Sequence, residues 1–168
     1  MSTEIWLILV VSIVVALYGL VRYAARPYTW RVAAPDLLPY LERLLKRGYG
    51  GSFMVIEEPD GPRFVQFAKY IKGGGNIGVE LSFPRAAWSE PYFDEFEQYL
   101  LTSEIAFKRQ AVQTPPTIEF LDVDFGRDTA KAHEVAKAIL AVVFKIPIST
   151  QLKVRFSNLS LNDELIDR

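Results

Sequence analysis

Three stretches of the chain space their apolar residues three and four positions apart, which is the repeat of an amphipathic helix. Asp36 can cap the first stretch, and a glycine-rich segment follows it, as is common after a helix end. The second stretch has a proline in its first turn, where proline is well tolerated. The pattern therefore predicts helices that begin at Asp36, after Ser89, and at Asp128 or Thr129, the last of them running to about Lys145.

Short runs rich in aromatic and β-branched residues lie between these helices and after them. In the run from Ile77 to Phe83 apolar and polar residues alternate, which is typical of a strand with one wet face. Turn-forming segments at 59–62 and 73–76 separate the first three runs. Strands are predicted at Ser52–Glu58, Phe64–Ile71, Ile77–Phe83, Ile105–Val112, Thr117–Phe125 and, at the end, Leu152–Phe156. The order α-β-β-β-α-β-β-α, with a further strand, predicts an α+β fold with an antiparallel sheet and packed helices.

The segment Ile5–Val21 carries no charged residue over seventeen positions. A helix of that length spans about 25 Å, and the apolar residues that follow bring it close to the thickness of a hydrocarbon core. A cleaved signal peptide is the alternative, but residues 1–4 carry an acid and no base, whereas a signal peptide begins with basic residues. We therefore expect a retained transmembrane helix through which the protein associates with the membrane.

Basic residues follow this segment, starting with Arg22, Arg26 and Arg31. By the positive-inside rule they predict a single-pass protein of the inner (cytoplasmic) membrane with its C-terminal domain in the cytoplasm. The expected organisation is a membrane segment with its flanks at 1–26, a connector at 27–35, a cytoplasmic α+β domain at 36–158 and a polar tail at 159–168.

Composition removes several classes of function. The 19 basic and 20 acidic residues nearly cancel, so no nucleic-acid partner is expected. The chain has no Cys and one His, His133, which excludes disulfides, thiolate nucleophiles and a multi-histidine metal site within one subunit. No cofactor is predicted.

Two strings of residues carry a resemblance to known families: Gly61–Ala68, which reads GPRFVQFA, and Gly75–Leu81, which reads GNIGVEL. Together with the order of elements over residues 36–145, they resemble the fold of class I type III secretion chaperones and of the related YbjN and TY-Chap families. The resemblance implies a small protein-binding module, often dimeric and without catalytic residues. The apolar segment at the start of the chain is a departure from those families.

The acidic run Asp122–Asp128 is the strongest candidate for chemistry. A calcium loop would need oxygen ligands at alternate positions, but Gly126 stands at the third such position and no Glu closes the loop. The alternative is a strand end with solvated acids and Asp128 as the cap of the next helix. His133 is expected to be exposed or at the edge of the core, and Gly73–Gly75 to form a hairpin turn and not a phosphate loop.

Aromatic residues suggest a binding surface. Both faces of the predicted strand Phe64–Ile71 are largely apolar, so one of them needs a cover from helices, from a second copy of the chain or from another protein. Phe64, Gln66 and Tyr70 share one face and form the candidate protein-binding surface. The leading hypothesis is thus a membrane-anchored, non-catalytic binding module, chaperone-like in type. The alternatives are a membrane-tethered enzyme that uses Asp122 or Asp124, and an immunity-type inhibitor.

Overall fold

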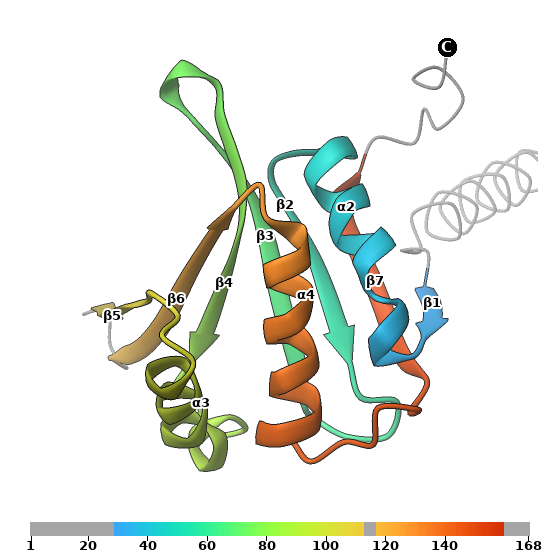
Figure 1. Ribbon diagram of the computed structural model, residues 1–168, viewed down its shortest axis with the longest axis vertical. Helices are drawn as coiled ribbons and strands as arrows, with labels where there is room; N and C mark the ends of the chain where they lie inside the picture. Colours follow the sequence, from blue (N-terminus) through green and yellow to red (C-terminus); the bar gives the residue numbers. More distant parts are fainter. Residues whose placement is uncertain (1–28, 113–116, 160–168) are drawn as a thin grey trace, which may run out of the picture.

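The computed structural model describes residues 29–112 and 117–159 (Figure 1). Three α-helices and seven strands make up this part, together with two short 3₁₀ turns, η1 at Ala34–Asp36 and η2 at Gly73–Gly75. The helices are α2 (Leu38–Arg47), α3 (Glu90–Thr102) and α4 (Thr129–Ala138), which continues as a π-helical turn over Ile139–Val143. The strands are β1 (Thr29–Val32), β2 (Gly48–Glu57), β3 (Phe64–Lys72), β4 (Asn76–Pro84), β5 (Lys108–Val112), β6 (Ile118–Gly126) and β7 (Leu152–Leu159).

All seven strands form one antiparallel sheet in the order β1-β7-β2-β3-β4-β6-β5. The predicted α+β class, antiparallel sheet and packed helices are therefore confirmed. The predicted transmembrane helix lies outside the described residues. Within them, no helix has the length and apolar character needed to cross a bilayer.

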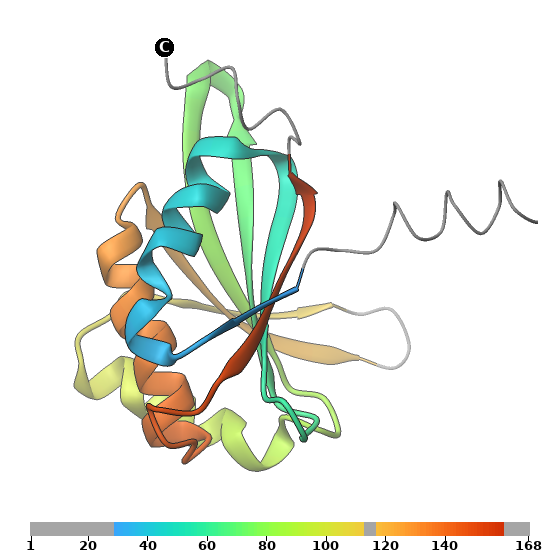
Figure 2. The same cartoon turned by 90° about the vertical axis from the view of Figure 1, so that its right-hand side faces the viewer.

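The three helices lie on one side of the sheet, and no described helix covers the other side (Figure 2). Strand alternation sends one set of side chains towards the helices, where for example Met54 of β2 pairs with Phe67 of β3 and Phe67 with Leu81 of β4. These side chains are buried together with the inner faces of the helices. The largest fully buried ones are Phe67, Phe83, Phe93, Phe96 and Phe144. We call the opposite side of the sheet the open face.

Strand β1 was not predicted, because Thr29–Val32 fall within the expected connector. These four residues pair with Arg155–Leu152 of β7, at the other end of the described chain. A strand of this length has little pattern of its own and forms only because β7 offers it an edge. Trp30 anchors it, with its ring 5.5 Å from that of Phe156 and 6.0 Å from that of Tyr40.

The helices begin close to the positions predicted from the sequence, but only one of the two predicted aspartate caps is found. Asp128 caps α4 as expected, since its carboxylate accepts a hydrogen bond of 2.8 Å from the Lys131 backbone. Asp36 does not cap α2: it lies inside η1, and Leu37 stands at the cap position. The extra 3₁₀ turn moves the start of α2 two residues later than predicted.

Candidate functional site

The open face changes in character across the sheet. One row of cross-strand neighbours runs Ser157, Phe53, Ala68, Glu80 and Asp124, from β7 through β2, β3 and β4 to β6. Its centre is apolar and its β4–β6 end is acidic. Val55, next to Phe53 on this face, is only 8% exposed although no described helix lies over it. The open face therefore combines an apolar centre with an acidic end.

A cleft of about 370 Å³ lies at the acidic end, and we call it the acidic cleft. It is lined by the end of β3, the middle of β4, part of β6 and the residues that lead into and begin β5. Its polar lining residues are Lys72, Glu80, Ser82, Lys108, Gln110, Asp122 and Asp124. Three carboxylates and two ammonium groups thus face one hollow.

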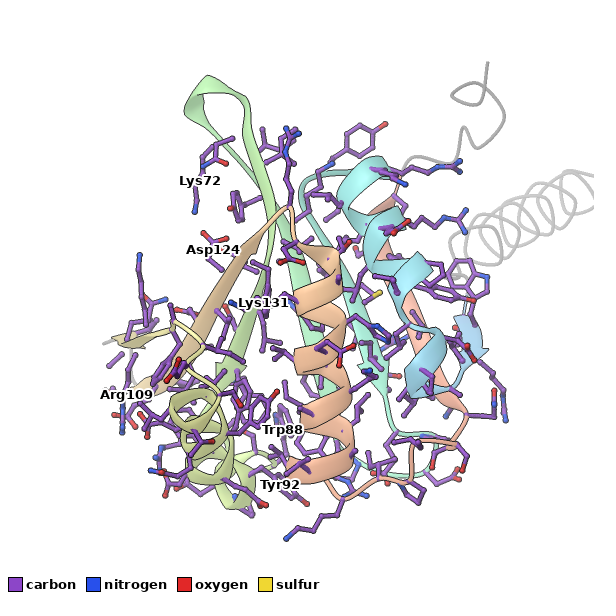
Figure 3. All side chains as sticks on the ribbon, in the orientation of Figure 1. Lys72, Trp88, Tyr92, Arg109, Asp124 and Lys131 are labelled. Atoms are coloured by element: carbon purple, nitrogen blue, oxygen red, sulfur yellow. The ribbon has the colours of Figure 1, made fainter. Side chains whose placement is uncertain are left out.

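Asp124 is held by three neighbours. The Tyr70 hydroxyl donates a hydrogen bond of 2.8 Å to its Oδ1, and the Gly126 backbone donates one of 2.9 Å to the same oxygen. Lys72 Nζ lies 3.6 Å from Oδ2, and in Figure 3 Lys72 points from the β3–β4 hairpin towards Asp124. Burial alone would raise the pKa of Asp124, but these contacts outweigh it and lower that pKa.

Two backbone features bring Tyr70 and Asp124 together. A bulge in β6, where Val79 pairs with Gly126 and Glu80 with Asp124, sets the position of Asp124 in the strand. Gly78 pairs with Tyr70, and a Cβ at Gly78 would overlap the phenol and lie 2.8 Å from the Gly126 Cα. The missing side chain at position 78 therefore lets the Tyr70 ring cross β4 to reach Asp124.

Asp122 is also held in place. The Ser82 hydroxyl donates a hydrogen bond of 2.6 Å to its Oδ1, and the Gln110 amide donates one to Oδ2. Each carboxylate oxygen thus has a donor from a neighbouring strand. The carboxylate oxygens of Asp122 and Asp124 thus bind groups of the protein itself. This suits a structural role in joining β3, β4, β5 and β6.

Glu80 differs from both aspartates, because no hydrogen bond or ion pair to it is found within the described residues. Desolvation raises its pKa, Lys72 opposes that shift, and the charges of Asp124 and Asp122 add to it. Glu80 was not singled out from the sequence. The alternation over Ile77–Phe83 did assign it to the wet face, but only the β4–β6 register shows that two aspartates lie beside it.

The three residues of the predicted protein-binding surface have different environments. Gln66 lies exposed on the open face, opposite Val55 of β2. Tyr70 lies on the same face but is committed to Asp124. Phe64 lies at the end of β3 and stacks on Trp88, with ring centroids 4.3 Å apart. Trp88 also contacts Phe83 and Phe144, so Phe64 packs against aromatic residues of the core. Figure 3 shows Trp88 close to Tyr92, which contacts Phe144 as well.

His133 is buried and not exposed or at the edge, which corrects the sequence-based expectation. Its Nε2 lies 3.0 Å from the carbonyl oxygen of Ala34, so it joins α4 to η1. The run Gly73–Gly75 forms the tip of the β3–β4 hairpin, as expected, with positive φ at Gly74 and Gly75. Among the described residues, no three His, Asp or Glu side chains are grouped to hold a metal ion.

Comparison of the chain with protein-family models, with curated proteins and with solved structures gives no match. The open face and its acidic cleft are therefore the basis for a functional assignment.

Proposed function

We propose that this protein is a single-pass protein of the inner membrane whose cytoplasmic domain binds another protein, or a second copy of itself, through the open face. The domain acts as a non-catalytic, chaperone-like module, and neither a cofactor nor nucleic acid takes part. The membrane part of the proposal rests on the uncharged segment Ile5–Val21 and on the arginines that follow it.

One observation carries the binding role: a seven-stranded sheet has helices on one face only, and the other face has an apolar centre. Apolar surface that no helix covers commonly marks an interaction site. Phe53 and Ala68, which are half-buried, and Val55, which is buried, form this centre next to exposed Gln66. The resemblance of the chain to secretion chaperones and the YbjN and TY-Chap families points to the same kind of role.

The charges beside the apolar centre specify the chemistry of the partner. The acidic cleft adjoins Ala68 through Glu80, so a bound segment meets apolar side chains first and carboxylates at one end. A segment with apolar residues and a Lys or Arg towards that end complements this surface, because opposite charges fix orientation and register.

Site-specific photocrosslinking in intact membranes tests the proposal. A photoreactive residue at Gln66, which is exposed beside the apolar centre of the open face, is expected to give a crosslinked product. The same residue at Gln98, exposed on α3, serves as the matched control and is expected to give none. The mass of the product distinguishes a second copy of the chain from another protein.

A face variant strengthens the test. Ala68→Glu adds a charge at the centre of the open face and is expected to abolish the Gln66 crosslink while the thermal unfolding transition persists. A crosslink equally strong from Gln98, or one that survives Ala68→Glu, contradicts binding through the open face. Recovery of the chain in the soluble fraction, without membranes, contradicts the anchoring.

A second candidate function is a membrane-tethered enzyme that uses a carboxyl group as general acid or base. It is favoured by the acidic cleft, where the pKa of Glu80 is raised and that of Asp124 is lowered. Carboxyl groups whose pKa values are pushed apart are the pattern of acid–base pairs. Under this alternative Glu80→Gln removes an activity found by substrate screening, whereas Glu104→Gln on the surface leaves that activity unchanged.

A further inference from the structure

The charges of the domain are divided between its two edges. Residues 29–47 and 152–159, which form β1, α2 and β7, contain six basic and two acidic residues. Residues 80–124, which include α3, β5 and most of β6, contain three basic and nine acidic residues. Figure 1 shows that β1 and α2 lie at one side of the molecule and α3 and β5 at the other.

We call the first of these the basic edge, and its basic residues are Arg31, Arg43, Lys46, Arg47, Lys153 and Arg155. Arg31 is exposed on the outermost strand, and the side chain of Lys46 is 71% exposed. A shallow hollow of about 300 Å³ on α2 is lined by Pro39, Glu42, Arg43, Lys46 and Arg47. Lys46 lies 3.3 Å from Glu42 and Arg155 pairs with Glu57, so carboxylates partly balance these cations.

The chain that joins this edge to the apolar segment is short. Eight peptide units connect Val21 to Thr29, the first residue of β1, and fully extended they reach at most about 28 Å. From Ala25 the corresponding limit is about 14 Å. The edge that carries Thr29 must therefore stay close to any bilayer that contains Ile5–Val21. The sequences on either side of the edge, 22–28 and 160–168, add three basic and three acidic residues and leave its charge balance unchanged.

We propose that the basic edge binds the anionic phospholipid headgroups of the membrane in which the protein is anchored. This inference rests on the anchoring stated under the proposed function, and it adds how the domain is oriented. Lys and Arg near an anionic surface are attracted to it over about a Debye length. The negatively charged edge, with the acidic cleft, then faces away from the bilayer and stays accessible to a basic partner segment.

The absence of Cys from the chain makes a direct test practical, because one introduced cysteine carries a unique fluorophore. The full-length protein is placed in nanodiscs with nitroxide-labelled headgroups, and quenching reports contact with the lipid surface. The probe positions are Pro39→Cys, in the hollow on α2, and Gln98→Cys, exposed on α3 as the control. Discs of phosphatidylcholine alone are compared with discs that contain phosphatidylglycerol.

We expect the Pro39→Cys probe to be quenched at least twofold more strongly in phosphatidylglycerol discs, with the excess lost in 0.5 M NaCl. The Gln98→Cys probe should respond equally to both lipids. Arg31→Glu with Lys46→Glu should bring the signal to the phosphatidylcholine level, since each lost cation weakens attachment roughly fivefold. The matched double variant Lys131→Glu with Lys145→Glu, at exposed positions away from the basic edge, should leave the quenching unchanged.

Equal quenching in both lipids, or quenching that persists after charge reversal at Arg31 and Lys46, overturns the inference. Insertion is scored separately by co-purification of the chain with the discs. A chain that does not enter the discs contradicts the anchoring and with it this inference, whereas an inserted chain with lipid-independent quenching contradicts this inference alone. Unchanged thermal unfolding of the double variant shows that folding is not the cause.

Discussion

The hydroxyl of Tyr70 and the carboxylate of Asp124 are joined by a hydrogen bond of 2.8 Å, although 54 positions separate the two residues in the chain. The bond crosses β4 and ties β3 to β6 on the open face. Lys72 completes the group, with its Nζ 3.9 Å from the centre of the Tyr70 ring and 3.6 Å from Asp124. These contacts join β3 to β6, two of the strands that line the acidic cleft. They also shift the pKa values of Tyr70 and Asp124, which can be measured.

Tyr70 should ionise at a higher pH than the other tyrosines. Burial and the hydrogen bond to Asp124 raise the pKa of Tyr70 to about 12 from 10.0. A pKa raised by folding contributes stability that is complete below pH 10 and is lost as the pH rises through 12. Absorbance of tyrosinate should show one group of eight ionising last, and Tyr70→Phe should remove that step. An unchanged titration curve for Tyr70→Phe contradicts this assignment.

Gly78→Ala should destabilise the domain, because its methyl group would overlap the Tyr70 phenol and approach the Gly126 Cα to 2.8 Å. Forced overpacking of this kind costs about 1–3 kcal/mol. Chemical denaturation measures the loss, and Gly73→Ala, where nothing lies within 4 Å, is the matched control. In the double variant Gly78→Ala with Tyr70→Ala the loss attributable to position 78 should shrink, since the phenol is gone.

Much of this architecture could be predicted from local pattern. The strands from β2 to β4 and the cap at Asp128 follow from alternation, turn residues and a capping side chain. Strand β1 could not be predicted, because its stability comes from pairing with a strand about 120 positions away. For the same reason the sequence nominated Asp122 and Asp124 but not Glu80, which only the β4–β6 register and its bulge bring beside them.

The contacts of individual side chains were equally hard to predict. His133 is buried because η1, an unpredicted 3₁₀ turn, brings the Ala34 carbonyl within 3.0 Å of its ring. Phe64 was expected to lie on a binding surface, and its stacking on Trp88 depends on the loop before α3, which carries no periodic pattern. The local sequence pattern therefore predicts helices and strands. The contacts of individual side chains depend on loops that are distant in the sequence, and the pattern does not predict these loops.

Lys69→Met should stabilise the domain by about 1 kcal/mol. Lys69 is 5% exposed on the helix-facing side of β3, and among the described residues no acceptor or carboxylate pairs with its amine. Desolvation accordingly lowers the pKa of Lys69, so its charged form is disfavoured in the folded state. Methionine keeps a similar volume and removes the charge. Denaturant midpoints measure the change, with Lys145→Met on the surface as the control, and a clear loss of stability would show that Lys69 has a partner.

Glu80 and Asp124 should respond to neutralisation in opposite directions at pH 7. The pKa of Asp124 is lowered by folding, so its contribution is present above its ordinary value of 3.8 and is lost as the pH falls through the folded value. Asp124→Asn should therefore destabilise the protein at pH 7. The pKa of Glu80 is raised above its ordinary value of 4.5, so protonated Glu80 contributes to the stability of the fold below pH 4.5. This contribution is lost as the pH rises through the pKa of Glu80 in the folded state.

At pH 7 the ionised Glu80 is therefore an unfavourable charge beside Asp122 and Asp124, and Glu80→Gln should stabilise the domain. The measurement is the free energy of unfolding from pH 3 to 8 for the parent and both variants. Because Asp124 is half exposed, its effect should shrink in 0.5 M NaCl, where the charge of Lys72 is screened. A loss of stability in Glu80→Gln equal to that in Asp124→Asn would mean that Glu80 has a stabilising partner. All three carboxylates of the acidic cleft would then be paired within the protein, and none would be available to bind a ligand.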